Sequence, residues 1–276
     1  MLALVIGEGE IGTPIFEMLR AAYGKEVCCR DIEEPDWATE KGAMYVMGDG
    51  GDHYSFTFLH ICFPQGVGWN KQISNYIEQY EPKAVVIHST LHPGTTEQLN
   101  EFRPVFYYSP VRGNIKDGMR WCLERYTKYV SSLAARKKPL LKWEKLDEMV
   151  HKHLSDAGFQ VKMVKDSTSL EYAKVLDLCW YGLNIAFYQE LERICGVLDY
   201  KTVRNFIEST PTESEGRAAR AFFYGGYIGG HCVVPAFEKL LALHDVPMIK
   251  AALESNIKRE RELTMNPENL LGLDSV

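Results

Sequence analysis

The stretch SLEYAKVLDLCWYGLNIAFYQELERICGV, residues 169–197, predicts one long helix because it contains no proline and few glycines. Between residues 175 and 187, only Asp177 and Asn184 carry strongly polar side chains. A helix that is apolar on almost all sides belongs in a protein interior or an oligomer interface. Its unbroken apolar runs are far too short to span a bilayer. We therefore expect a homodimer with Trp180, Leu183 and Phe187 at or near the shared surface, and no membrane partner.

A single polar stripe runs along this predicted helix. At about 100° per residue, its members fall within less than a quarter-turn: Lys174, Asp177, Tyr181, Asn184 and Tyr188. The stripe is either a solvated seam or a row of side chains that faces a ligand, because buried polar groups need partners.

Toward the N-terminus, residues 2–22 read LALVIGEGEIGTPIFEMLRAA, which predicts an apolar strand, a glycine turn and an amphipathic helix. In a GxGxxG turn the first glycine allows the tight bend, and the second lets a pyrophosphate approach the backbone. The third lets helix and strand pack closely, so that the helix N-terminus faces the phosphates. The alternative is a glycine turn in an α/β protein without a ligand. We expect a dinucleotide to be bound by Gly7, Gly9, Glu10, Ile11 and Gly12.

An acidic residue follows at the spacing that such a turn requires. The next strand, residues 26–31, ends in Asp31, 19 residues after Gly12. A carboxylate there bonds the ribose hydroxyls and repels a 2′-phosphate, which favours NAD over NADP. Arg30 beside it weakens that preference.

Two further strands end in candidate cofactor contacts. A strand over residues 56–63 stops at Pro64, and a strand over 83–88 runs into Ser89 and Thr90. Doubly wound folds bind ligands at the carboxyl ends of their parallel strands. Serine and threonine there are as often turn formers as ligand contacts.

The pattern divides the chain into an α/β Rossmann-type domain, residues 1–166, and an all-helical substrate and dimerisation domain, residues 167–276. Strands near 105–108, 126–131 and 160–164 and a helix near 143–157 are expected to complete the first sheet and its cover. After the long helix we expect a short helix over 202–208 and a loop over 209–230. Helices near 235–243 and 247–263 and a loosely ordered tail from 264 complete the pattern.

Composition excludes several partner classes. The 276 residues are 46% hydrophobic and 25% charged, which is ordinary for a globular protein. A net charge of −6 gives no support for nucleic-acid binding. Seven cysteines without disulfide-like spacing and no leader pattern favour a cytoplasmic location. We expect no metal site.

Several motifs resemble, in one order, the UDP-glucose/GDP-mannose (nucleotide-sugar) dehydrogenase family. They are GEGEIG (7–12), Asp31, HICFP (60–64), STLHPGTT (89–96), YSPVR (108–112), KVLDLCWYGLNIAFYQELERIC (174–195), GGHC (229–232) and the Ala251-Ala252…Asn256 pattern. The resemblance covers most of the chain. It implies a Rossmann domain followed by a helical domain like that of 6-phosphogluconate dehydrogenase, which dimerises through its long helix.

The family oxidises a sugar primary alcohol twice with two NAD molecules, and the second oxidation passes through a cysteine thiohemiacetal and a thioester. The resemblance implies that Cys232 is the nucleophile, that Lys174 stabilises the oxyanion and assists proton transfer, and that Thr90 lies beside cofactor and substrate. It further implies substrate contacts from Arg112, Asn184, Gly229 and His231. Without the family, a lone cysteine is usually a small buried hydrophobe.

The chain departs from the family pattern at three positions. Leu178 stands where the family has asparagine, Ala236 where it has aspartate, and Val111 where it has glutamate. The sequence also ends where the family continues into a C-terminal nucleotide-binding domain, so the resemblance is to a truncated form. We expect an NAD-dependent oxidoreductase acting on a polar, sugar-like alcohol or aldehyde. The alternatives are a catalytically reduced NAD-binding protein and a two-electron dehydrogenase of the hydroxyacid type.

Overall fold

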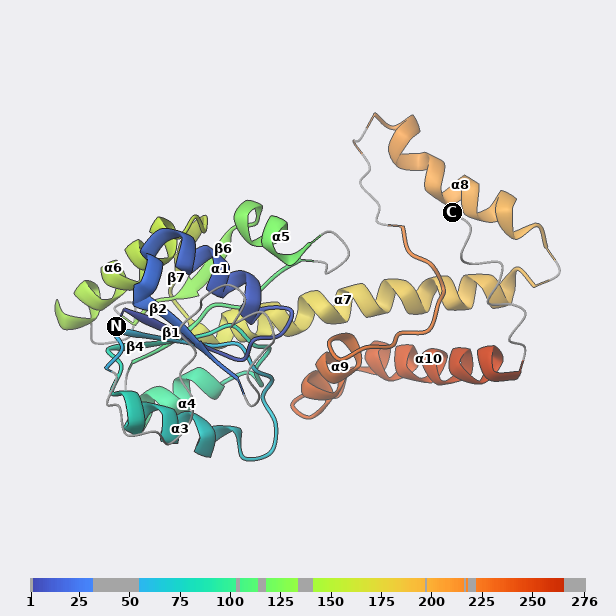
Figure 1. Cartoon of the computed structure of the whole chain (residues 1–276). Coiled ribbons are helices and arrows are strands. Elements are labelled where there is room, and N and C mark those ends of the chain that lie inside the picture. Colours follow the sequence, from blue (N-terminus) through green and yellow to red (C-terminus); the bar gives the residue numbers. More distant parts are fainter. Residues whose placement is uncertain are drawn as a thin grey trace. The chain divides into compact units, whose positions relative to one another are not determined.

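The computed structural model describes residues 2–31, 55–102, 105–113, 118–133, 141–196, 198–215, 217 and 222–265. These residues form two compact units, Met1–Lys174 and Val175–Val276. Figure 1 shows an α/β first unit and a helical second unit. The expected fold class, a Rossmann-type domain followed by a helical domain, is confirmed.

The first unit is built on a five-stranded parallel sheet with the strand order β2-β1-β3-β4-β5. The strands are β1 (Ala3–Ile6), β2 (Val27–Arg30), β3 (Phe58–Ile61), β4 (Ala84–Ile87) and β5 (Phe106–Tyr108). Ala3 lies in register with Val27 on one side and with Phe58 on the other. The strands are nearly continuous apolar runs because the parallel sheet is covered on both faces.

Two helical layers provide that cover (Figure 1). One face carries α1 (Gly12–Tyr23), α5 (Met119–Arg125) and α6 (Leu141–Asp156), and the other carries α3 (Trp69–Tyr80) and α4 (Thr95–Phe102). A short 3-10 turn, η1 (Gly24–Glu26), joins α1 to β2. Because side chains alternate along a strand, Ala3 and Val5 join the α1 layer, whereas Leu4 and Ile6 join the α3 layer.

The last two predicted strands are present but do not extend this sheet, which corrects the expectation. β6 (Lys128–Ser131) and β7 (Val161–Val164) form a separate two-stranded parallel sheet. At the β5 edge, the backbone N–H of Tyr108 donates to the side-chain Oγ of Ser131 at 2.8 Å. A side chain therefore takes the place of a backbone ladder between β5 and β6.

The long helix α7 (Ser167–Ile194) begins within the first unit. Leu170 packs into the α3-side core, and the carboxylate of Glu171 accepts hydrogen bonds from Gly94 N, Thr96 N and Thr96 Oγ1 at 2.5–2.9 Å. Glu171 thereby satisfies N–H groups at the start of α4. The unit boundary after Lys174 consequently lies inside α7, eight residues beyond the predicted domain boundary.

The second unit contains the rest of α7 with α8 (Tyr200–Glu213), α9 (Val233–Leu241) and α10 (Pro247–Met265). A Cβ at Gly182 would lie 2.5 Å from Phe237 and 2.6 Å from Val233, so this glycine lets α7 and α9 approach closely. α8 continues five residues past its predicted end. Pro211 lies in its last turn, where it removes a single intrahelical hydrogen bond. Most of the expected tail lies outside the described residues.

Among the described helices, none combines the length and the apolar character that crossing a membrane requires.

Candidate functional site

The glycine turn between β1 and α1 requires two of its glycines for steric reasons. Gly7 has φ +95°, and a Cβ there would lie 2.9 Å from Phe63 N. A Cβ on Gly12 would lie 1.7 Å from the carbonyl oxygen of Gly7, so any side chain would push α1 away from β1. Gly9 is exposed, and a Cβ there would meet no atom within 4 Å. The turn is therefore closely packed at Gly7 and Gly12 and has open space next to Gly9.

The first turn of α1 presents a helix N-terminus to a ligand, with Thr13 N–H already donating to the Gly9 carbonyl at 3.1 Å and a proline at position 14. Its N-cap residue, Ile11, is half-buried and makes no side-chain cap hydrogen bond. The first N–H groups of a helix have no intrahelical partner, and the helix dipole favours an anion there. The exposed Gly9 and Glu10 precede this turn. The predicted dinucleotide contacts thus form one turn whose open shape and position at a helix N-terminus fit a pyrophosphate.

Asp31 lies at the end of β2, against the same turn. Its Oδ2 accepts a hydrogen bond from the backbone N–H of Glu8 at 2.6 Å. This bond holds a half-buried carboxylate beside the glycine turn, where it can bond a ribose hydroxyl and repel a 2′-phosphate.

Glu8 is a feature of the turn that the sequence analysis missed. Its side chain is 8% exposed, and neither carboxylate oxygen has a hydrogen-bond partner. Burial, with a smaller contribution from the charge of Asp31, raises the pKa of Glu8 to about 8. A protonated acid therefore lies within the glycine turn at neutral pH. Its signal in the sequence was a charged residue next to the first glycine of the motif.

The other cofactor candidates follow β3 and β4. Ser89 is buried, and its Oγ donates to the carbonyl oxygen of Phe63 at 2.5 Å, which ties the two strand ends together. Pro64 is exposed and Thr90 is half-buried, so both lie nearer the surface of this edge. Ser89 is a structural brace here, whereas Pro64 and Thr90 remain candidates for ligand contact.

Arg112 and Lys174 are the cationic candidates of the first unit. Arg112 is exposed, lies over the ring of Tyr129 at 5.1 Å, and donates to the carbonyl oxygen of Thr127 at 3.0 Å. Lys174 is half-buried, one helical turn after Glu171. Its charge is one of the causes that lower the pKa of the buried Lys128.

In the second unit, Cys232 is at the N-cap of α9. All seven cysteines are described; five are buried, Cys62 is half-buried and only Cys232 is exposed. His231 and Gly229, which precede it, are also exposed. Asn184 lies on α7 and donates to the carbonyl oxygen of Trp180 at 2.7 Å, so its amide bonds its own helix. The predicted polar stripe is split, because Tyr188 is buried whereas Asp177 and Tyr181 are exposed.

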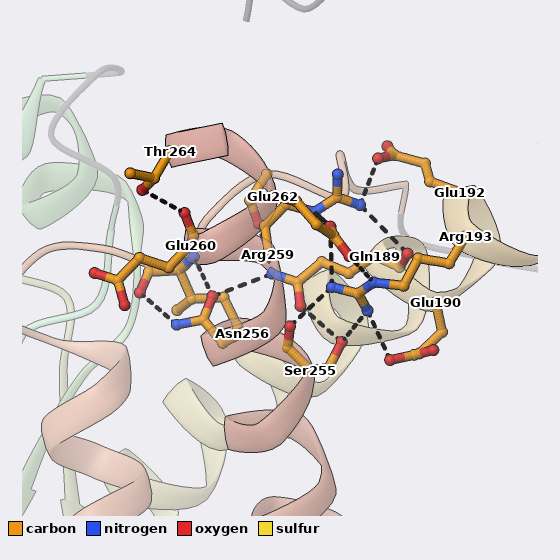
Figure 2. Close-up of polar contacts among 12 residues, drawn as sticks. Gln189, Glu190, Glu192, Arg193, Ser255, Asn256, Arg259, Glu260, Glu262 and Thr264 are labelled. Atoms are coloured by element: carbon orange, nitrogen blue, oxygen red, sulfur yellow. Dashed lines mark hydrogen bonds and ion pairs between the residues drawn. The ribbon is translucent and has the colours of Figure 1, made fainter. Parts of the chain in front are cut away.

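The loop that leads to Cys232 is held by a polar network between α7 and α10. Asn256 bonds both backbone groups of Ile228, accepting from its N–H at 2.7 Å and donating to its carbonyl at 3.1 Å. Gln189 donates to the Gly226 carbonyl at 2.7 Å and accepts from Ser255 Oγ at 2.9 Å. Figure 2 shows these side chains, together with ion pairs such as Arg193–Glu262 and Arg259–Glu192. The network fixes the backbone four residues before the thiol.

The three positions that depart from the family pattern carry apolar side chains, and two of them are buried. Val111 and Ala236 are buried, and Leu178 is half-buried. A glutamate at 111 would lie in the α1-side core, beside Leu123 and Val130. These positions therefore carry no groups for positioning water or moving protons.

The structure thus places Gly7, Gly9 and Gly12 in one turn of the first unit and bonds Asp31, at the end of β2, to that turn. Pro64, Ser89 and Thr90 lie at the ends of neighbouring strands. Lys174 belongs to the first unit and Cys232 to the second. Within the described part of the chain, no group of three histidine, cysteine or acidic side chains has the arrangement of a metal site.

No protein-family model matches the chain, and no curated protein matches it in sequence. Its fold is similar to that of a UDP-D-ManNAc dehydrogenase from Pyrococcus horikoshii, with a TM-score of 0.74 and 19% identity over 99% of this chain and 72% of that one. A UDP-N-acetyl-mannosamine dehydrogenase from S. aureus has a TM-score of 0.63 and 15% identity, over 100% and 73% of the two chains. A 3-hydroxyisobutyrate dehydrogenase from Mycobacterium tuberculosis has a TM-score of 0.66 and 12% identity, over 96% and 94%. At these identities the similarity establishes the shared fold.

Proposed function

We propose that this protein is an NAD-dependent oxidoreductase that oxidises an alcohol or aldehyde group of a polar, sugar-like substrate. The observation that carries the proposal is the glycine turn, which is open above Gly9 and has the Asp31 carboxylate bonded to its backbone. The dehydrogenases of the same fold, several of which act on nucleotide sugars, support the substrate class.

In this proposal the turn at Gly7–Gly12 holds the pyrophosphate, and Asp31 holds the adenosine ribose. Pro64 and Thr90 line the remainder of the cofactor site, and Ser89 braces the strand ends that carry them. The bound dinucleotide supplies a hydride acceptor. Lys174 assists proton removal from the hydroxyl group and stabilises the alkoxide, and Cys232 adds to an aldehyde to form a thiohemiacetal. Arg112, Asn184, Gly229 and His231 are the proposed substrate contacts.

The cofactor assignment is tested by fluorescence titration with NADH and NADPH. NADH is expected to bind at least about tenfold more tightly, equivalent to about 1.4 kcal/mol. Asp31→Asn keeps an acceptor for the Glu8 N–H but removes the charge, so it should narrow this ratio by weakening repulsion of the 2′-phosphate. Asp31→Ala also loses the acceptor and should lower the affinity for both dinucleotides. Equal binding of both by the unmodified protein, or binding of neither, would overturn the proposal.

Two alternatives are favoured by particular observations. The apolar side chains of Val111, Leu178 and Ala236 favour a catalytically reduced NAD-binding protein. The match to nearly the full length of a 3-hydroxyisobutyrate dehydrogenase favours a two-electron hydroxyacid-type enzyme that uses Lys174. The number of NADH molecules formed per substrate molecule separates these possibilities. A catalytically reduced protein forms none, a two-electron enzyme forms one, and an enzyme that oxidises the alcohol twice forms two.

We further propose that the protein is a cytoplasmic homodimer. The cytoplasmic location is supported by seven cysteines without disulfide-like spacing. The dimer is supported by the apolar side chains that α7 leaves exposed on the second unit: Leu176, Trp180, Tyr181, Phe187 and Ile194.

A further inference from the structure

Four buried side chains form an unbroken hydrogen-bonded chain on the α6 side of the sheet. Lys128 Nζ lies 3.0 Å from His88 Nδ1, and His88 Nε2 lies 3.0 Å from His60 Nδ1. His60 Nε2 in turn lies 3.0 Å from His153 Nε2 on α6. All four residues are at most 3% exposed. Because its neighbours bond opposite nitrogens of His60, the imidazoles do not converge on one point as a metal site requires.

With Lys128 charged, its surroundings fix the direction of every bond. The ammonium has three N–H groups and three acceptors: His88 Nδ1, the Ser109 carbonyl at 2.7 Å and the Pro110 carbonyl at 3.2 Å. His88 must then donate from Nε2 to His60, and His60 must donate from Nε2 to His153. His153 carries its own proton on Nδ1, a buried atom without a hydrogen-bond partner.

With Lys128 neutral, the same distances allow the opposite direction. His88 donates from Nδ1, either to the lysine lone pair or to the Ser109 carbonyl at 3.0 Å. His60 then donates from Nδ1 to His88, and His153 donates from Nε2 to His60. Both arrangements satisfy each bond between neighbouring side chains.

We propose that Lys128, His88, His60 and His153 hold one mobile proton, whose departure from Lys128 reverses the tautomers of all three histidines. Lys128 passes a proton to His88 Nδ1, and His88 passes its Nε2 proton to His60 Nδ1. His60 passes its Nε2 proton to His153 Nε2, and His153 gives its Nδ1 proton to solvent water when the structure around this buried atom opens locally. The four side chains together lose one positive charge, and no imidazolium accumulates. Uptake of a proton reverses each step.

Burial, modified by the charges around these four side chains, places this exchange near neutral pH. Burial, opposed by Cys62 and reinforced by Lys174 and Arg112, lowers the pKa of Lys128 to about 7. Burial also lowers the pKa values of His60 and His88 well below their usual range and that of His153 to about 4, so these imidazoles stay neutral. Five titratable or charged groups face these four side chains: Cys62 after β3, Arg112 after β5, Lys174 on α7, Asp156 on α6 and Tyr23 on α1. Glu8 acts in turn on Cys62.

The hydrogen-bonded chain of Lys128 and the three histidines gives the proposed reaction an internal proton store. Oxidation of an alcohol by NAD releases one proton with each hydride transferred, and Lys128 lies within the electrostatic reach of Lys174. This use rests on the proposed function, whereas the reversal of the tautomers does not.

The test is a pH titration of the apoprotein, labelled with ¹⁵N-histidine, by long-range ¹H–¹⁵N correlation from pH 5.5 to 9. The chain has eight histidines, and single replacements by glutamine assign the signals. His60, His88 and His153 are expected to exchange their protonated and unprotonated nitrogens over one shared interval near pH 7. Separate midpoints, an imidazolium signal from any of the three, or unchanged tautomers across the range would overturn the proposal.

Lys128→Met provides a second test. With no ammonium, His88 Nδ1–H is expected to stay on the Ser109 carbonyl, which locks the high-pH pattern at every pH. Lys162→Met, at an exposed lysine of β7, is the matched control and should leave the reversal intact. A reversal that persists in Lys128→Met would also refute the proposal. If that variant does not fold, the titration of the unmodified protein decides alone. An NADH titration of the same samples tests the proposed function separately.

Discussion

Replacing Glu8 with glutamine is expected to stabilise the apoprotein by about 3 kcal/mol at pH 7. The Glu8 carboxylate is buried without a hydrogen-bond partner, and its pKa is raised from 4.5 to about 8. Each pKa unit corresponds to about 1.4 kcal/mol, so ionising this group in the folded state costs roughly 5 kcal/mol in full. pH 7 lies about 2.5 units above the pKa of 4.5 that Glu8 has in the unfolded chain. These 2.5 units account for the loss of about 3 kcal/mol in the free energy of unfolding at pH 7.

The direction of the pH dependence follows from proton counting. Between pH 4.5 and 8 the unfolded chain has lost the Glu8 proton, whereas the folded protein retains it. The free energy of unfolding therefore falls as pH rises through this window and levels off above about pH 8. Glutamine keeps the size of the side chain and removes the titration. The advantage of Glu8→Gln should thus be small at pH 5 and grow by about 1.4 kcal/mol per pH unit up to pH 8.

Urea denaturation at pH 5, 6, 7 and 8, without added dinucleotide, measures this difference. Glu26→Gln is the matched control, because Glu26 is an exposed carboxylate of the same unit. Its effect on the free energy of unfolding should stay within about 0.5 kcal/mol at each pH. A difference between Glu8→Gln and the unmodified protein that does not change from pH 5 to 8 would refute the reasoning.

Three further predictions concern the second unit. Iodoacetamide should label Cys232 ahead of the other six cysteines because it alone is exposed, and mass spectrometry of the modified peptides would reveal any other order. Asn256→Ala leaves both backbone groups of Ile228 without their partner, so we expect a loss of about 2 kcal/mol in urea denaturation and faster labelling of Cys232. Asn256→Asp keeps the acceptor for the Ile228 N–H and should lose less. Light scattering at micromolar concentration should give the mass of a dimer, and Trp180→Glu should shift it toward a monomer; a monomeric unmodified protein would contradict the proposed interface.

The parts of the fold that the sequence predicted are those governed by local patterns. Residues 26–31 were predicted as a strand, and β2 occupies Val27–Arg30. The GxGxxG spacing predicted a turn in which Gly7 needs a positive φ and Gly12 needs close contact, and both are found. These requirements arise within a dozen residues, so the sequence alone carries them.

The parts that it did not predict depend on contacts between distant segments. β6 was expected in the main sheet, but the side chain of Ser131 accepts the hydrogen bond from the Tyr108 N–H. The pattern of apolar residues in a strand does not indicate such a side-chain bond. α8 was expected to end at residue 208, because residues 209–230 are rich in glycine, serine and arginine and were expected to form a loop. Near the end of α8, Pro211 removes only one intrahelical hydrogen bond, and the helix continues to Glu213.

The most consequential omissions are the buried titratable groups, and their physical origin explains why they were missed. His60 lies on β3 and His88 directly follows the neighbouring parallel strand β4. Both point to the same face, which strand alternation could have indicated. Alternation does not reveal what lies opposite that face, and the partners come from β6 and α6, 40 and 93 residues away in the chain. A histidine at an apolar strand position is usually a hydrogen-bonded core residue. It becomes part of a proton-carrying chain only when tertiary packing aligns donors and acceptors at both of its nitrogens, as Lys128 and His153 do here.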